Sequence, residues 1–265
     1  MTAPTGTASG TAPAVRRSSW LDVVRAELLK LRTTWLTLIL LACSVAIAVL
    51  SVAATLATEG DGENQINLTD EELTDAVFGS AGIATIFALV MGIVIVTTEF
   101  RHQTITPSVL ITPRRWPLIV AKFVAAALLG AVYAITTAVV VSVIGLPWLA
   151  IKDVTITSGD AIGSLSAAAV SVVLYGIVGV GVGALIRNQV AAIVGALAWT
   201  LVIESLAVAL LPEVGRWLPG GAAGAIGAGD GSDLLEPWAG ALVFVGYGVL
   251  FGVVGSLTTI RRDIT

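Results

Sequence analysis

Residues 77–98, VFGSAGIATIFALVMGIVIVTT, decide the fold because they form one uncharged and mainly apolar run. A helix crosses the roughly 30 Å hydrocarbon core of a bilayer with about 20 such residues. Five further runs are also mainly apolar, and the only charged residues within them are Lys122 and Glu204. The six predicted spans cover residues 34–57, 77–98, 117–144, 163–186, 190–211 and 238–260. The sequence therefore predicts an all-α, polytopic membrane protein, in which the long third span is tilted or extends into one interface.

The composition of the whole chain excludes a soluble enzyme. Of its 265 residues 56% are hydrophobic and only 12% are charged, against about 25% charged in ordinary soluble domains. The net charge of −4 argues against nucleic-acid binding. The single cysteine, Cys43, leaves no intrachain disulfide to form.

The orientation follows from the connections, because basic residues collect on the cytoplasmic side of membrane proteins. Twelve of the 14 basic residues fall in the N-terminal segment, the second and fourth connections and the C-terminal tail, whereas the other side has only Lys152 and Arg216. Thirteen of the 18 acidic residues lie on that other side. We therefore expect both termini in the cytoplasm, including a flexible tail over residues 1–18 and a short tail over residues 261–265.

An amphipathic helix is predicted over residues 19–33, before the first span. Its apolar stripe has helical spacing and consists of Trp20, Val24, Leu28, Leu31 and Trp35. Such a helix is expected to lie in the membrane surface. Its predicted surface residues are Trp20, Arg25, Lys30 and Arg32. It either sets the orientation only, or also contacts a cytoplasmic partner.

The second connection, residues 97–117 with the sequence TTEFRHQTITPSVLITPRRWP, is long, basic and partly apolar. Its apolar residues predict a short helix along the membrane surface, which Pro113 ends. Glu99 lies where span two leaves the membrane and is expected to pair with Arg101, Arg114 or Arg115. The segment is either a basic interfacial loop or the docking element of a soluble subunit, and we assign it residues 99–116.

Two features mark the part of the chain beyond span four. Residues 212–237 are rich in glycine and proline and are predicted to form short helices that re-enter the outer leaflet. Glu204 is the only acidic residue well within a span, and it either makes a bundle or dimer contact or lines a path or gate. Small-residue spacings such as Gly179/Gly183 and Gly248/Gly252 permit close helix approach.

The residues needed for catalysis or cofactor binding are missing from the sequence. None of the three lysines follows a glycine, so the phosphate-binding loop of ATPases is missing. The only histidine, His102, has no second histidine or thiolate cluster with which to bind a metal or haem. We therefore predict a protein that is not an enzyme and binds no cofactor or metal itself.

Several short segments, taken in order, resemble the permease subunits of the type-2 ABC exporter family (ABC-2 type), particularly actinobacterial ones. They are AELLKLRTTW over residues 26–35, EFRHQTI over 99–105, TPRRWP over 112–117, Lys122, Glu204 and RWLP over 216–219. The resemblance extends from about residue 19 to the end. It implies an N-terminal connecting helix, a cytoplasmic coupling helix between spans two and three, and outer re-entrant helices before span six.

The resemblance also implies partners and residue roles. Two permeases, identical or homologous, would pair mainly through spans two and five, and two separate ATPase subunits, which bind the ATP and magnesium, would dock below. The implied coupling residues are Glu99, Arg101, Thr104, Pro113, Arg114 and Arg115. Glu204 would lie near the dimer interface or an outer gate.

The predicted function is therefore that of an exporter permease in the cytoplasmic membrane, driven by separate ATP-hydrolysing subunits. Two alternatives remain open. A non-transporting scaffold or immunity protein would share the topology without a paired ATPase. A secondary transporter would need ion-coupling carboxylates and usually an internal repeat, whereas the spans hold one Glu and no visible repeat.

Overall fold

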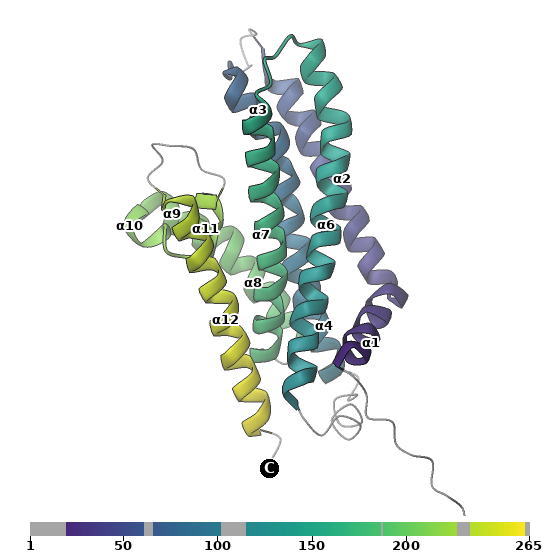
Figure 1. Ribbon diagram of the computed structural model, residues 1–265. Helices are drawn as coiled ribbons and strands as arrows, with labels where there is room; N and C mark the ends of the chain where they lie inside the picture. Colours follow the sequence, from purple (N-terminus) through teal and green to yellow (C-terminus); the bar gives the residue numbers. More distant parts are fainter. Residues whose placement is uncertain (1–19, 61–65, 102–114, 187, 227–233, 263–265) are drawn as a thin grey trace, which may run out of the picture.

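The computed structural model describes residues 20–60, 66–101, 115–186, 188–226 and 234–262 (Figure 1). Six of its helical stretches are long and apolar enough to cross a membrane, which confirms the predicted all-α class. The helices are α1 (Trp20–Thr33), α2 (Trp35–Thr58), α3 (Asp70–Gly79), η1 (Ser80–Ile83), α4 (Ala84–Arg101), α6 (Arg115–Ile151), α7 (Ser158–Leu185), α8 (Gln189–Ala198), η2 (Trp199–Glu204), α9 (Ser205–Leu210), α10 (Pro212–Gly215), α11 (Pro219–Ile226) and α12 (Pro237–Arg262).

Helix α7 is the centre of the bundle, because α4, α6 and α12 all pack against it (Figure 1). Glycines allow these helices to approach closely. A Cβ atom on Gly179 of α7 would collide with the carbonyl oxygen of Leu89 on α4, and one on Gly252 of α12 would lie 2.7 Å from the ring of Phe123 on α6. The small-residue spacings seen in the sequence are thus confirmed as packing contacts.

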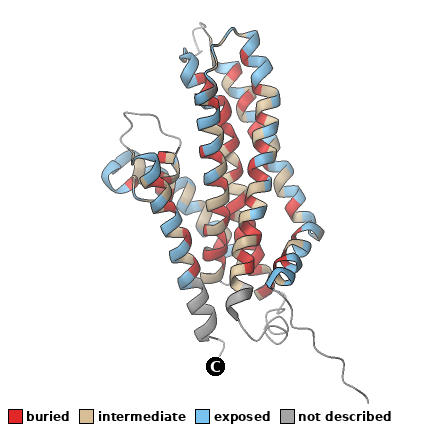
Figure 2. Cartoon of the chain, in the orientation of Figure 1, coloured by how far each residue is buried: buried red, intermediate tan, exposed pale blue. Residues whose placement is uncertain are grey.

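The outside of the bundle is apolar. Figure 2 shows buried residues concentrated where α4, α6 and α7 meet, and exposed residues along α2, α8 and α12. Those exposed residues include many large aliphatic side chains, for example Leu50, Val190 and Leu242. A continuous apolar surface of this kind is what lipid covers in a membrane-spanning bundle.

Spans two and three are both longer than predicted. Span two was expected to begin at Val77, but α3 precedes it, starting at Asp70 behind a capping box in which Thr69 and Glu72 exchange hydrogen bonds. The 3-10 turn η1 then joins α3 to α4. Helix α6 continues to Ile151 with Pro147 inside it, and this proline lacks the N–H that would bond to the carbonyl oxygen of Val143.

Span five is interrupted. It begins as α8, passes through the π-helical turn η2 and ends as α9. The short helices α10 and α11 follow, in agreement with the short helices predicted after residue 212, while their re-entry into the outer leaflet stays a prediction. In Figure 1 they lie beside the middle of the bundle rather than beyond its end, and α11 packs against α12.

Candidate functional site

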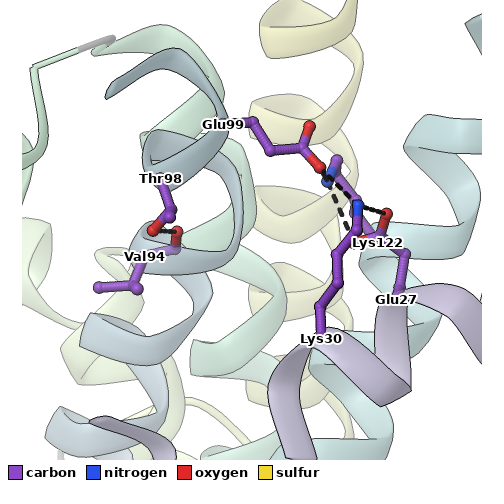
Figure 3. A network of polar contacts seen from close by, with 6 residues as sticks. All are labelled: Glu27, Lys30, Val94, Thr98, Glu99 and Lys122. Atoms are coloured by element: carbon purple, nitrogen blue, oxygen red, sulfur yellow. Dashed lines mark hydrogen bonds and ion pairs between the residues drawn. The ribbon is translucent and has the colours of Figure 1, made fainter. Parts of the chain in front are cut away.

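Four charged side chains converge where α1, α4 and α6 meet (Figure 3). Glu27 and Lys30 come from α1, Glu99 from the last turn of α4, and Lys122 from the third turn of α6. We call these four residues the ion quartet. It lies at the end of the bundle where α4 ends at Arg101 and α6 begins at Arg115, and we call this the α1 end.

The quartet alternates carboxylates and ammonium groups, so each charge has two opposite neighbours. Lys30 Nζ lies 2.9 Å from Glu27 Oε1 and 3.0 Å from Glu99 Oε1. Lys122 Nζ lies 3.1 Å from Glu27 Oε2 and 2.7 Å from Glu99 Oε1. The four formal charges cancel, and the contacts join α1 to two helices, α4 and α6, that lie far from it in the sequence.

Burial makes this pairing necessary. Glu27, Glu99 and Lys122 are each buried, whereas the Lys30 side chain is 53% exposed. Partial desolvation alone would lower the pKa of Lys30, but hydrogen bonds and negative charge from Glu27 and Glu99 outweigh it and raise the pKa above its ordinary value. A buried charge without a partner costs several kcal/mol, so the quartet holds its three helices in one mutual arrangement.

The helix period of α1 explains how Glu27 reaches the interior. Val24, Glu27 and Leu31 follow at steps of three and four, and all three are buried. Leu31 packs in a cluster with Met91 of α4 and Ala125 of α6. The bundle-facing side of α1 therefore carries Glu27 between two apolar anchors, directly against the ends of α4 and α6.

The predicted membrane-surface residues of α1 divide into two groups. Trp20, Arg25 and Arg32 are exposed, in keeping with a surface position. Lys30 instead belongs to the quartet. Within the apolar stripe, Val24 and Leu31 are buried against the bundle, while the position of the helix in the membrane surface stays a prediction.

The coupling residues predicted from sequence are described only in part. Glu99 is at the expected place, and among the described side chains its ion-pair partners are Lys30 and Lys122. Arg101 is exposed at the end of α4, and Arg115 opens α6. Thr104, Pro113, Arg114 and most of the predicted surface helix lie outside the described residues, as does the side chain of Arg115.

Sequence reasoning missed Glu27 and the role of Lys122. Lys122 was visible as the one basic residue within a predicted span. Glu27 was visible as the one carboxylate on the apolar face of the first helix. Glu27 and Lys122 have opposite charges, apolar neighbours and predicted positions on the same side of the membrane. Considered together, these three features predict that the two side chains form a buried pair.

Glu204 is the second notable carboxylate. It is 2% exposed and closes the π-helical turn η2, and its Oε1 accepts a hydrogen bond from Trp199 Nε1. These residues are five apart, a spacing that places them on different sides of an α-helix but on one side of a π-helix, whose hydrogen bonds run from i to i+5. The turn thus brings an indole donor to an intramembrane carboxylate.

Comparison with known protein families gives one match. A family model described as ABC-2 family transporter protein matches residues 25–217, which include the whole quartet and Glu204. A search of the curated proteins finds no match. Among the described residues, no group of three or more His, Cys, Asp or Glu side chains is placed to hold a metal ion.

Proposed function

Since the chain belongs to the ABC-2 transporter family, we propose that it is the permease of an exporter and forms the path that its substrate takes across the cytoplasmic membrane. Members of this family are transmembrane components that associate with ABC ATPase subunits. In our proposal both termini are cytoplasmic, the partner subunits bind and hydrolyse ATP with magnesium, and this chain contributes no catalytic residue.

The main observation in support of the proposal is the position of the ion quartet. It joins α1 to the end of α4 and the start of α6, and these two helix ends flank residues 102–114. A force applied to that segment acts on α4 and α6 through the backbone and on α1 through the quartet. We assign ATPase docking to the basic segment that contains Arg101, Thr104, Pro113, Arg114 and Arg115.

Movement of α4 reaches the rest of the membrane domain through α7. The two helices pack along their length, and glycine contacts such as Gly92 with Gly179 leave little room for independent sliding. A partner that contacts the α1 end differently in its ATP-bound and ATP-free states would therefore shift spans two and four together. This is the route by which hydrolysis would change access to the path.

Span five supplies the surface for a second permease copy in this proposal. Only 6% of the residues in its most apolar stretch are buried within the chain, against 61% for the span that contains α4. Exposed side chains along it include Val194, Leu201, Leu206 and Leu210. Span two is largely enclosed by other helices and exposes less surface. We therefore propose that the two permease copies contact each other mainly through span five, and that Glu204 lies beside this contact.

Assembly with an ATPase tests the proposal. The chain is co-expressed with the ABC ATPase of a neighbouring reading frame, and the complex is purified through the chain. We expect a stoichiometric complex that Arg101→Glu weakens by roughly tenfold or more, because reversing one charge at a docking surface adds repulsion. Glu71→Lys, an exposed reversal at the opposite end, is the matched control.

Two results would contradict the proposal. The first is that no neighbouring frame encodes an ATPase with a phosphate-binding loop and that no ABC ATPase copurifies, which would favour a scaffold or immunity protein. The second is that Arg101→Glu binds the ATPase as tightly as the wild type does, which would remove the docking assignment.

A further inference from the structure

A cavity of about 290 Å³ lies between α4, α7, the span-five helices and α12. Glu204 and Pro219 line it on the side of α11, and Leu185 and Ile186 line it toward the α1 end. None of its lining residues belongs to the ion quartet. Ligand pockets for small molecules commonly begin at about 300 Å³, so this cavity suits a compact ligand.

The walls of the cavity are apolar and aromatic, with one charged group. Tyr175, Trp199 and Phe251 contribute rings, and most other lining residues are aliphatic. Thr200 adds a hydroxyl group. Glu204 is the only acidic side chain among the lining residues, and none of them is Lys, Arg or His. The carboxylate therefore has no cationic partner within the walls.

One oxygen of that carboxylate lacks a partner. Oε1 accepts from Trp199, whereas Oε2 is buried without a hydrogen bond in the described part of the chain. Oε2 lies against the backbone of Gly220, whose amide is close to the carboxylate but does not meet the geometry of a full hydrogen bond to Oε2. Oε2 is thus covered by the backbone of α11 rather than open to the cavity, and the Glu204 carboxylate is the one charged group among the apolar and aromatic walls.

The chemistry of the walls restricts which ligand the cavity suits. A positive charge beside Glu204 would offset the cost of a buried carboxylate. Aromatic rings within about 6 Å also attract cations through their electron-rich faces. A bare metal ion needs several oxygen ligands, which the aliphatic walls do not provide, whereas an apolar body fits them.

We propose that this cavity binds an apolar molecule that carries one positive charge. The charged group lies at Glu204, and the apolar body extends along α8 toward Ile186. This binding requires neither ATP nor a partner subunit, and it stands whether or not the bound molecule is the transported one.

The test uses the full chain in lipid nanodiscs and radiolabelled phenethyltrimethylammonium, whose charge is independent of pH. Binding is measured by equilibrium dialysis, with empty nanodiscs subtracted to remove partition into lipid. We expect saturable binding of one cation per chain. The neutral isostere (3,3-dimethylbutyl)benzene, which has carbon in place of nitrogen, should not compete.

Variants assign the binding to the cavity. Glu204→Gln, which keeps size and hydrogen bonding, should weaken cation binding by at least about tenfold, as expected for loss of a buried charge pair. Glu213→Gln, an exposed carboxylate on the adjacent α10, should bind as the wild type does.

Three outcomes would overturn the proposal. They are the absence of saturable binding to the wild type, equal competition by the neutral isostere, and unchanged affinity of Glu204→Gln. The second outcome would identify a pocket for neutral apolar chains such as lipid. None of these measurements involves an ATPase, so their failure would leave the proposed permease function standing.

Discussion

Lys122 is a cation on a membrane span, and the structure explains how it is tolerated there. It contacts Glu27 and Glu99 at 3.1 and 2.7 Å, and its side chain is 7% exposed. Replacing it by methionine keeps the volume but leaves two carboxylates with only the half-exposed Lys30. We predict that Lys122→Met lowers the free energy of unfolding by about 3–5 kcal/mol, measured by denaturant titration in detergent micelles.

Two further variants control for the effect of burial. Lys30→Met should cost about 1 kcal/mol or less, because that side chain is 53% exposed and water screens its charge. The double variant Glu27→Gln/Lys122→Met should lose less than the sum of its single variants, because it removes opposite charges together. Additive losses would show that the quartet is not one coupled unit.

Single residues show where sequence reasoning succeeds and fails. The position of Glu99 at a helix end followed from its place after a long apolar run. Its partners did not, because Lys30 and Lys122 lie 69 and 23 positions away, and spacing along a chain does not reveal which helices meet. Glu204 was predictable as an intramembrane carboxylate, but its bond with Trp199 depends on a π-helical turn that apolar periodicity does not indicate.

At the scale of elements, the contact between α4 and α7 depends on glycine. A methyl group on Gly179 would collide with the backbone of α4, so Gly179→Ala must push the two helices apart. We predict a loss of about 1–3 kcal/mol in the free energy of unfolding. Gly163→Ala is the matched control on the same helix, since nothing lies within 4 Å of its added atom.

The Gly163→Ala control should be neutral or slightly stabilising, because alanine favours helix over glycine. If Gly179→Ala were as stable as that control, α4 and α7 would not be in close contact, and the route proposed for movement between them would be lost.

The ends of helices were predictable where the sequence contains a capping pattern. The start of α3 carries the Thr-x-x-Glu pattern of a capping box at Thr69 and Glu72, so it was available from the sequence and was overlooked. Which face of α1 packs against the bundle could not be predicted from the sequence. An apolar stripe fits lipid and protein equally well, and only the position of α4 and α6 decides between them.

At the scale of the whole molecule, the uneven charge distribution predicts the orientation. A background with Cys43→Ser leaves no native thiol. In intact cells, a membrane-impermeant maleimide should label Glu71→Cys before lysis and Arg25→Cys only after lysis. Both positions are exposed, so access to the reagent depends on the side of the membrane alone. Labelling of both before lysis would contradict the assignment of α1 to the cytoplasm.

The number of spans and their approximate positions were predictable, because about 20 apolar residues per crossing is a requirement of the bilayer itself. The helix order inside the bundle was not. The central position of α7 and the peripheral position of span five depend on how side chains fit together at many contacts. The periodicity of apolar residues does not indicate which helix each face packs against.

The most direct test of the central claim is the change in ATP hydrolysis when the ATPase subunits bind this chain in nanodiscs. We predict that the wild-type chain alters the turnover rate, and that Lys122→Met, still folded and assembled, loses roughly fivefold or more of that effect. An ATPase rate that is the same with the wild-type chain, with Lys122→Met and without either would contradict the account.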